Sequence, residues 1–501
     1  MVDREELARA LAAEREAAQN GKHPPHEQGD GLEGWLIDEA RKLQHLPTLD
    51  LVGITESGAA YVLARNFGDQ LRHTEGRGWL AWDGTRWSTQ NGEASARQAA
   101  RIVAAGYLLA AMNAPSTGGA RDRAITLARR ILSSRGVDGV LKEAASLHPV
   151  RCQDASFDPD PWALNTPSGI IDLRTGKVRP HDPSAMLTRI TNVPYDPDAK
   201  SPRWRRFLHE VFADDKETVL FVLRWLGYCL TGDMREQRYI VAWGEGANGK
   251  STLFNAVRWV MGDYAADINT DALTLRHNAG QANPDIAKLP GVRLAIAPEW
   301  DKALRADETL IKQITGGDPI STRFLHRNTF AFSPACKLVI FGNEKPALRG
   351  TDEGTWRRPI LLPFTQQFTG ERADKALPAT LRAEATGILA DMVRGCVAWQ
   401  RDGLKVPKAL EEAKKKWQDD SDDVRKFIDE RCVENEKAFV MMGELYIAFT
   451  AWGGKMSQKT FSERVVAIVG EDKRKRTRQG VQVRGLGLRA EGAEGAEGAR
   501  E

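Results

Sequence analysis

Apolar residues recur at helical spacing through much of the first half of the chain. Residues 94–112 and 119–134 are rich in Ala and Arg with this periodicity. Residues 203–230 carry aromatic and aliphatic side chains at the same spacing, and they are interpreted as a packed pair of helices rather than as a binding surface. The pattern therefore predicts helices in each of these three segments.

Two short hairpins are predicted within this half. Aromatic strands flank an Asp-Gly turn in residues 77–87, which is a strong hairpin signal. Residues 165–180 turn at Arg174-Thr175-Gly176 and indicate a second hairpin. Strands and helices are thus expected together in this part of the chain.

The pattern changes after residue 230. Short apolar strands alternate with helices up to about residue 365, which is typical of an α/β domain. Residues 372–400 return to helical spacing, and the charge run at 411–423 is interpreted as a solvated helix end and linker. A small last domain is expected, with helices at 424–433, 442–452 and 457–469 before a basic hairpin.

These changes divide the chain into six parts. They are a mobile N-terminal segment (1–56), an N-terminal α+β domain (57–230), an α/β core (231–370), a helical segment and linker (371–423), a small C-terminal domain (424–489) and a disordered low-complexity tail (490–501).

Composition narrows the class of protein. The apolar fraction of 42% and charged fraction of 28% are ordinary for a soluble globular protein. No stretch approaches the roughly 20 apolar residues of a membrane span, and the charged N-terminus lacks a signal core, so we expect a cytoplasmic protein. The five cysteines form no CxxC pair, which argues against zinc and against a disulfide framework. A net charge of +3 does not decide whether nucleic acid is a partner.

The segment after residue 238 carries the strongest chemical signal. A buried-strand pattern, 239–243, runs directly into a G-x-x-x-x-G-K-[ST] loop, and a helical pattern follows. Glycines let backbone N–H groups converge on phosphates, Lys250 reaches the terminal phosphates, and the Ser251 hydroxyl can bind Mg²⁺. The sequence therefore predicts an ATP and Mg²⁺ site formed by Gly244, Glu245, Gly246, Ala247, Asn248, Gly249, Lys250, Ser251 and Thr252.

Further polar residues follow two later strands. Glu299 and Asp301 lie just after the apolar strand 292–297, where a carboxylate must sit to hold Mg²⁺ or activate water. Asn343 ends the strand pattern 337–341, where its amide can orient water or the γ-phosphate. Glu299 is the expected metal ligand alongside Ser251.

The order of these motifs resembles the superfamily 3 helicases, specifically the phage and plasmid primase–helicase branch related to the poxvirus replication helicase. The resemblance covers about residues 55–489 and is most specific across 239–364. It rests on GEGANGKST (Walker A), RLAIAPEWD (Walker B), LIKQITGGDPISTRFLHRNTFAF (motif B′), KLVIFGN (motif C) and TWRRPILLPF (the arginine-finger region).

The resemblance implies an AAA+-like ATPase core that forms a ring, usually a hexamer, and translocates on single-stranded DNA. Members of this superfamily typically move from 3′ to 5′. The family pattern makes Asn343 the sensor, and it places an arginine finger at Arg357 or Arg358. The Walker B stretch departs from two adjacent acids, so the separate roles of Glu299 and Asp301 stay open.

Two basic segments are the expected DNA contacts. The hairpin tip that carries Arg323, His326 and Arg327 is placed by the family pattern in a central channel, where cations neutralise phosphates without reading sequence. The three helices and basic hairpin of 424–489 are interpreted as a winged helix, which could bind duplex DNA. Its candidate contacts are Lys473, Arg474, Lys475, Arg476 and Arg478.

The leading hypothesis is an ATP-dependent DNA helicase for phage or plasmid replication, acting in a bacterial cytoplasm with a primase or polymerase as a further partner. One alternative is a bifunctional primase–helicase. However, the region upstream is short for a primase, and Asp158 and Asp160 are bracketed by prolines that suit a turn. A second alternative is an ATP-switched initiator or loader that binds an origin.

Overall fold

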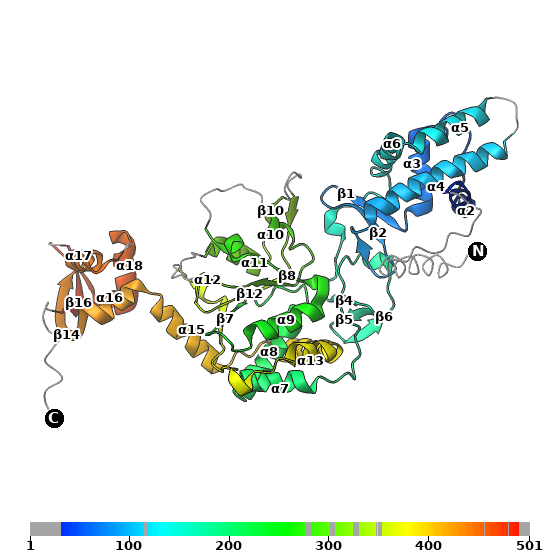
Figure 1. Cartoon of the computed structure of the whole chain (residues 1–501). Coiled ribbons are helices and arrows are strands. Elements are labelled where there is room, and N and C mark those ends of the chain that lie inside the picture. Colours follow the sequence, from blue (N-terminus) through cyan, green and yellow to red (C-terminus); the bar gives the residue numbers. More distant parts are fainter. Residues whose placement is uncertain are drawn as a thin grey trace.

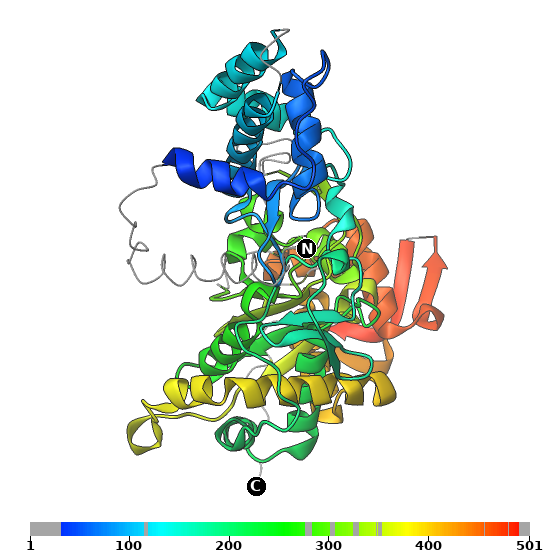
Figure 2. The same cartoon turned by 90° about the vertical axis from the view of Figure 1, so that its right-hand side faces the viewer.

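The computed structural model describes residues 32–114, 119–275, 283–300, 306–323, 330–346, 348, 353–454, 456–478 and 480–489. Figure 1 shows a helical N-terminal unit and a small C-terminal unit at opposite ends of the molecule, with a parallel sheet between them. Figure 2 gives the view turned by 90°, in which the helices of the N-terminal unit lie above the core.

The N-terminal unit packs five helices around alanine-rich faces. Its helices are α2 (Leu32–Arg41), α3 (Glu56–Phe67), α4 (Gly92–Met112), α5 (Ala120–Ile131) and α6 (Ser134–Ala144). The segment 1–56, predicted to be mobile, includes α2 in its described part. Leu36 and Ala40 of α2 are buried with Ile102 and Ala105 of α4, so this helix belongs to the N-terminal unit.

Both predicted hairpins are confirmed. Strand β2 (Gly78–Trp82) pairs with β3 (Trp87–Ser88) across the Asp-Gly turn, and β1 (Leu71–Thr74) adds a third strand. The second hairpin joins β5 (Gly169–Asp172) to β6 (Lys177–Arg179), with β4 (Ala163–Thr166) on its other side. The predicted helical pair is also confirmed as α7 (Pro202–Val211) and α8 (Lys216–Cys229).

Five parallel strands form the central sheet, in the order β13-β7-β12-β9-β8. All five carboxyl ends therefore meet at one edge, which is where ligands bind in open α/β sheets. The strands are β7 (Tyr239–Trp243), β8 (Ala265–Asp267), β9 (Leu294–Ala297), β12 (Lys337–Gly342) and β13 (Pro359–Pro363). The helices of this region are α9 (Lys250–Met261), α10 (Pro284–Ala287), α11 (Glu308–Gly316) and α12 (Glu353–Trp356), and a separate hairpin pairs β10 (Ile320–Thr322) with β11 (Phe330–Phe332).

Two buried cations fasten the carboxyl end of α8 to this sheet. Lys337 on β12 is fully buried; its Nζ donates to the backbone oxygen of Thr231 and lies 4.4 Å from the centre of the Tyr228 ring. Arg293 donates to the backbone oxygens of Leu230 and, at 2.7 Å, of Ala163. Cations are favourable at a helix carboxyl end, but burial lowers the pKa of Lys337 to about 7.

The region after the sheet is helical, as predicted for 372–400, with α13 (Leu377–Ala383) and α14 (Ala385–Asp402). The charge run interpreted as a helix end and linker lies largely within α15 (Lys408–Asp420). One tryptophan of that run, Trp417, is buried and contacts Trp356 edge-on at 5.1 Å between ring centres. Most of the run is therefore a helix anchored to the core by an aromatic residue within a charged sequence.

The C-terminal unit has three helices and a three-stranded antiparallel sheet of order β14-β16-β15. The helix predicted at 424–433 ends earlier, at Arg431, because an unpredicted strand, β14, begins at Cys432. The elements are α16 (Asp423–Arg431), β14 (Cys432–Met441), α17 (Met442–Trp452), α18 (Gln458–Val469), β15 (Arg474–Thr477) and β16 (Gly480–Leu488).

Candidate nucleotide-binding site

The glycine-rich loop joins the carboxyl end of β7 to the start of α9. Within this loop Gly244, Ala247 and Gly249 have positive φ angles of 156°, 57° and 87°. Residues in such conformations turn successive N–H groups toward one point, which makes an anion-binding concavity. At the start of α9 the Lys250 N–H donates to the Asn248 side-chain oxygen at 3.4 Å, and the N–H groups that follow it at the helix N-terminus add to this anion-binding tendency.

The segment after β13 holds one side of this loop. The backbone N–H of Phe368 donates to the Ala247 oxygen at 2.7 Å. The Asn248 side-chain nitrogen donates to the Phe364 oxygen at 3.2 Å. Helix α7 holds the other side, because a Cβ on Gly249 would lie 2.8 Å from a methyl group of Val211. The loop conformation is thus fixed by segments distant from it in sequence.

Lys250, the first residue of α9, is directed back into the loop. Its side chain is buried, and its Nζ donates to the Gly244 oxygen and, at 3.2 Å, to the Glu245 oxygen. Burial lowers the pKa of Lys250, because an ammonium ion loses hydration there. The neighbouring Ser251 is exposed and Thr252 is partly exposed. A phosphate group would supply Lys250 with the opposite charge that its surroundings lack.

The carboxylate and the amide predicted for this site come from the two strands beyond β7. Glu299 follows β9 with a positive φ of 60°, which is strained for a residue with a side chain. Trp300 donates its backbone N–H to the Phe341 oxygen at 3.3 Å, which places this segment against the end of β12. Asp301 lies outside the described residues, so the division of roles between the two acids stays a prediction.

Asn343 lies beside the end of β7. The indole nitrogen of Trp243 donates to the Asn343 backbone oxygen at 2.9 Å, and the Asn343 side chain is exposed. The Nζ of Lys345 lies 4.5 Å from the centre of the Trp243 ring. The structure therefore brings the loop, Glu299 and Asn343 to one edge of the sheet, as the sequence predicted.

Arg357 and Arg358 lie at the opposite edge. They precede β13, whose Pro359 pairs with Tyr239 at the start of β7 and whose Pro363 pairs with Trp243 at its end. Five residues at about 3.3 Å each separate the two edges by roughly 16 Å. Arg357 donates to the Gln237 side-chain oxygen, and Arg358 donates to the Gly354 oxygen.

Comparisons with known proteins match both the N-terminal unit and the region of the central sheet. A family model described as "D5 N terminal like" matches residues 60–213, and one for a family of unknown function, DUF5906, matches residues 242–358. The chain is 26% identical over 350 residues to "Putative helicase L207/L206" of Acanthamoeba polyphaga mimivirus, covering 63% of this chain and 35% of that protein. It is 25% identical over 227 residues to "Putative primase C962R" of an African swine fever virus isolate, covering 44% of this chain and 24% of that protein.

The chain is homologous to viral proteins of the D5-like, superfamily 3 primase–helicase type, as the two family-model matches and these relatives indicate. A further relative, "Putative helicase 121R" of Invertebrate iridescent virus 3, is 24% identical over 333 residues. The match covers 59% of this chain and 35% of that protein. This D5-like chain thus spans about a third of the length of the two helicase-named relatives. The solved apo structure of the NrS-1 C terminal region is more distant, with 13% identity, a TM-score of 0.41 and coverage of 62% of this chain and 88% of that one.

Several basic residues predicted to bind DNA are exposed in this D5-like protein. Arg323 is exposed at the end of β10, whereas His326 and Arg327 lie outside the described residues. In the C-terminal unit, β15 is an edge strand whose four residues are all exposed, and the flanking basic residues are exposed too. These predicted contacts are Lys473, Arg474, Lys475, Arg476 and Arg478.

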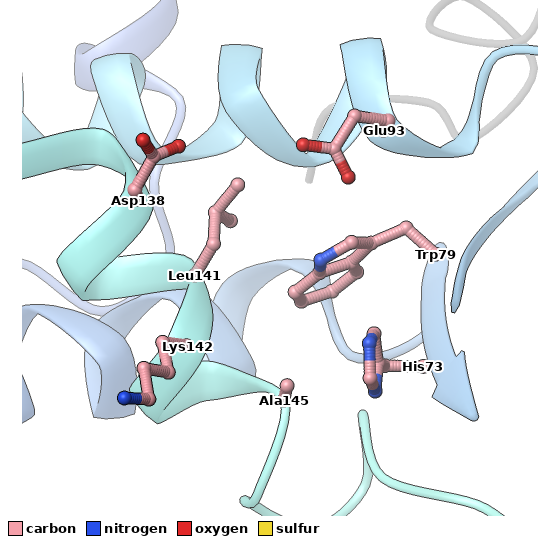
Figure 3. Close-up of a pocket in the computed structure, with 7 residues that line it drawn as sticks. All are labelled: His73, Trp79, Glu93, Asp138, Leu141, Lys142 and Ala145. Carbon is pink, nitrogen blue, oxygen red and sulfur yellow. The ribbon is translucent and has the colours of Figure 1, made fainter. Parts of the chain in front are cut away.

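A cavity of about 410 Å³ in the N-terminal unit was not predicted (Figure 3). It lies between α6, the start of α4 and strands β1 and β2, and the rings of His73 and Trp79 pack edge-on on one side of it with their centres 5.1 Å apart. Two carboxylates on its rim, Glu93 and Asp138, are both paired with Arg97. The cavity is remote from the glycine-rich loop in sequence, and its acids already have a cationic partner. It is therefore distinct from the nucleotide site.

Proposed function

We propose that this chain is an ATP-dependent DNA helicase of the superfamily 3 type that serves replication of a phage or plasmid. The observation that carries the proposal is the glycine-rich loop between β7 and α9. Its positive φ angles and the inward Lys250 form a phosphate cradle at the edge where Glu299 and Asn343 also lie. Homology to these viral proteins and the helicase names of relatives support a replication enzyme.

The residues at this edge suit ATP and Mg²⁺. The loop N–H groups and Lys250 would hold the β- and γ-phosphates, and Ser251 and Glu299 offer oxygen ligands of the kind that Mg²⁺ prefers. Bound Mg²⁺ would neutralise charge that develops on the phosphate oxygens. The remaining tasks belong to the protein: an acid after β9 orients the attacking water, and Asn343 senses the γ-phosphate.

The position of the arginines favours a homo-oligomer, which we propose to be a hexameric ring. Arg357 and Arg358 lie at the amino edge of the sheet, roughly 16 Å along the strand from the loop of the same chain. A cation is still needed for charge on the γ-phosphate, and an arginine supplied in trans is an established solution in phosphoryl transfer. Each subunit would therefore complete the site of its neighbour.

DNA would contact the protein at two predicted surfaces. The β10–β11 hairpin, which carries Arg323, would follow single-stranded DNA in the channel of the ring. The C-terminal unit would act as a winged helix, with the exposed basic strand β15 against phosphates.

No described helix combines the length and apolar composition that crossing a membrane requires.

A strand-displacement assay on forked DNA, with and without ATP, tests the proposal. We expect the wild-type chain to release the displaced strand only with ATP and Mg²⁺. ATP hydrolysis without any strand release, on forks with either a 3′ or a 5′ tail, would contradict a helicase. That result would instead favour an ATP-switched initiator or loader, for which the exposed basic strand β15 would be the origin contact.

Primer synthesis is a second candidate because one relative is named a primase. The acids that a primase would need are occupied in structural contacts. Asp158 accepts hydrogen bonds from the backbone and side chain of Thr188, and Asp160 pairs with Arg174. Among the described residues no group of three or more His, Cys, Asp or Glu could hold a metal ion. A primer-synthesis assay on a single-stranded template separates this candidate from the helicase.

A further inference from the structure

One face of the N-terminal unit carries a concentration of positive charge. Residues 119–135, which include α5, contain five arginines and a single acid, Asp122. All five arginines are exposed. They are Arg121, Arg123, Arg129, Arg130 and Arg135.

The packing of α5 fixes which side these arginines occupy. The buried residues of the helix, Ala124, Leu127, Ala128 and Ile131, belong to the core shared with α3, α4 and α6. The arginines must therefore lie on the solvent side. Arg123 and Arg130 are seven residues apart, so they lie on the same flank of the helix, about 10 Å from each other.

Most of this charge has no acidic partner within the described part of the chain. Arg130 pairs with Glu56 at 3.0 Å, whereas Arg121, Arg123 and Arg129 make no ion pair there. Arg97, on the neighbouring helix, is by contrast paired with two carboxylates. Three of the five arginines are therefore open to an anionic ligand.

We propose that the arginine face of α5 binds the sugar–phosphate backbone of DNA without reading its sequence. The polyanion is identified as DNA on the basis of the proposed function. Exposed arginines suit phosphates, whereas protein interfaces need a cluster of apolar or aromatic anchors at their centre. The exposed residues of 119–135 include one large apolar side chain, Leu132 at the end of α5, which does not form such a cluster.

This surface is separate from the DNA contacts already proposed. In Figure 1 α5 lies on the outer side of the N-terminal unit, away from the central sheet, and the C-terminal unit, which contains β15, lies at the other end of the molecule. The chain would thus hold DNA at a site beyond its motor as well as within it. A contact of this kind would help the protein to remain on DNA between ATP hydrolysis cycles.

Charge reversal in the full chain tests the inference. The variant Arg123→Glu/Arg129→Glu changes two exposed arginines that have no ion pair, and Arg123→Gln/Arg129→Gln removes the charge without adding acid. The matched control, Lys177→Glu/Arg179→Glu, reverses the same number of charges on the exposed strand β6. Circular dichroism and basal ATPase activity confirm that each variant folds.

The measurement is affinity for a labelled random-sequence DNA at several salt concentrations, without ATP. Losing two phosphate contacts should lower the slope of log affinity against log salt by about 1.4 to 1.8. We expect at least a tenfold loss of affinity at low salt for the Glu variant, a smaller loss for the Gln variant and little change for the control. A slope equal to that of the control would overturn the inference. Absence of DNA binding by the wild-type chain would instead overturn the proposed function.

Discussion

Replacing Lys250 with Ala removes a buried cation that is directed into the glycine-rich loop. The ammonium group donates to the backbone oxygens of Gly244 and Glu245, and the loop itself is held by separate contacts to Phe364 and Phe368. We therefore expect the loop to keep its conformation in Lys250→Ala. The variant should lose its contact with the phosphates of ATP and keep its fold.

The magnitude follows from the two kinds of contact involved. Removing one preorganised electrostatic group from a reaction site costs about 10²–10³ in turnover, or roughly 2.7–4 kcal/mol. Hydrogen bonds to a charged group contribute about 1.5–3 kcal/mol to stability, and water can replace part of this at the exposed Glu245. The variant should therefore remain folded while its ATP hydrolysis falls at least a hundredfold.

Steady-state ATPase measurements with and without DNA provide the readout. The matched control is Lys216→Ala, since Lys216 is also the first residue of a helix but is exposed and remote from the loop in sequence. Thermal melting shows whether each variant is folded. Turnover of Lys250→Ala above about a tenth of the wild-type value would refute the assignment of the loop, because a phosphate-binding lysine cannot be dispensable for the transition state.

The same lysine predicts a pH dependence. Burial lowers the pKa of Lys250 in the free protein, and bound phosphate should raise it again. ATP binding is then coupled to proton uptake, so affinity should fall as the pH rises through the lowered pKa. Isothermal titration in two buffers of different ionisation enthalpy measures this uptake. Equal apparent enthalpies in both buffers at alkaline pH would contradict it.

Three further predictions follow from other parts of the structure. Lys475→Glu/Arg476→Glu on the edge strand β15 should lower the salt slope of DNA binding by about 1.4 to 1.8 with basal ATPase unchanged, and an unaltered slope would show that β15 does not face DNA. Mixing inactive Arg357→Ala/Arg358→Ala subunits with the inactive phosphate-loop lysine variant should restore some ATPase activity, whereas mixed rings that stay inactive at every ratio would place the arginines in the site of their own chain. In the wild-type protein the unfolding free energy should rise by roughly 2 kcal/mol between about pH 7.5 and 9.5, because Lys337 has a pKa of about 7 when folded but its ordinary pKa when unfolded. Lys337→Met should lack this rise, and urea unfolding at both pH values measures it.

The sequence by itself determined the elements that local patterns specify. A buried-strand pattern, a glycine-rich loop and a helical pattern are contiguous in 239–261, so their order as β7, loop and α9 was predictable from residues alone. The carboxyl-end positions of Glu299 and Asn343 were predictable for the same reason, since polar residues that end parallel strands share an edge. Local patterns did not predict strand β14. This strand lies within a mostly helical segment and forms by pairing with β16, which is distant in sequence.

Tertiary structure alone decided what depends on distant pairing. The register of β13 against β7 puts Arg357 and Arg358 at the edge away from the loop, and no spacing in the sequence states which strands are neighbours. The contacts of Phe368 and Asn248 that fix the loop join segments more than a hundred residues apart. Lys337 reads in sequence as the polar start of a strand, yet it is fully buried because the carboxyl end of α8 packs against it. A sequence records which side chains are available, whereas their burial and partners arise only when the chain has folded.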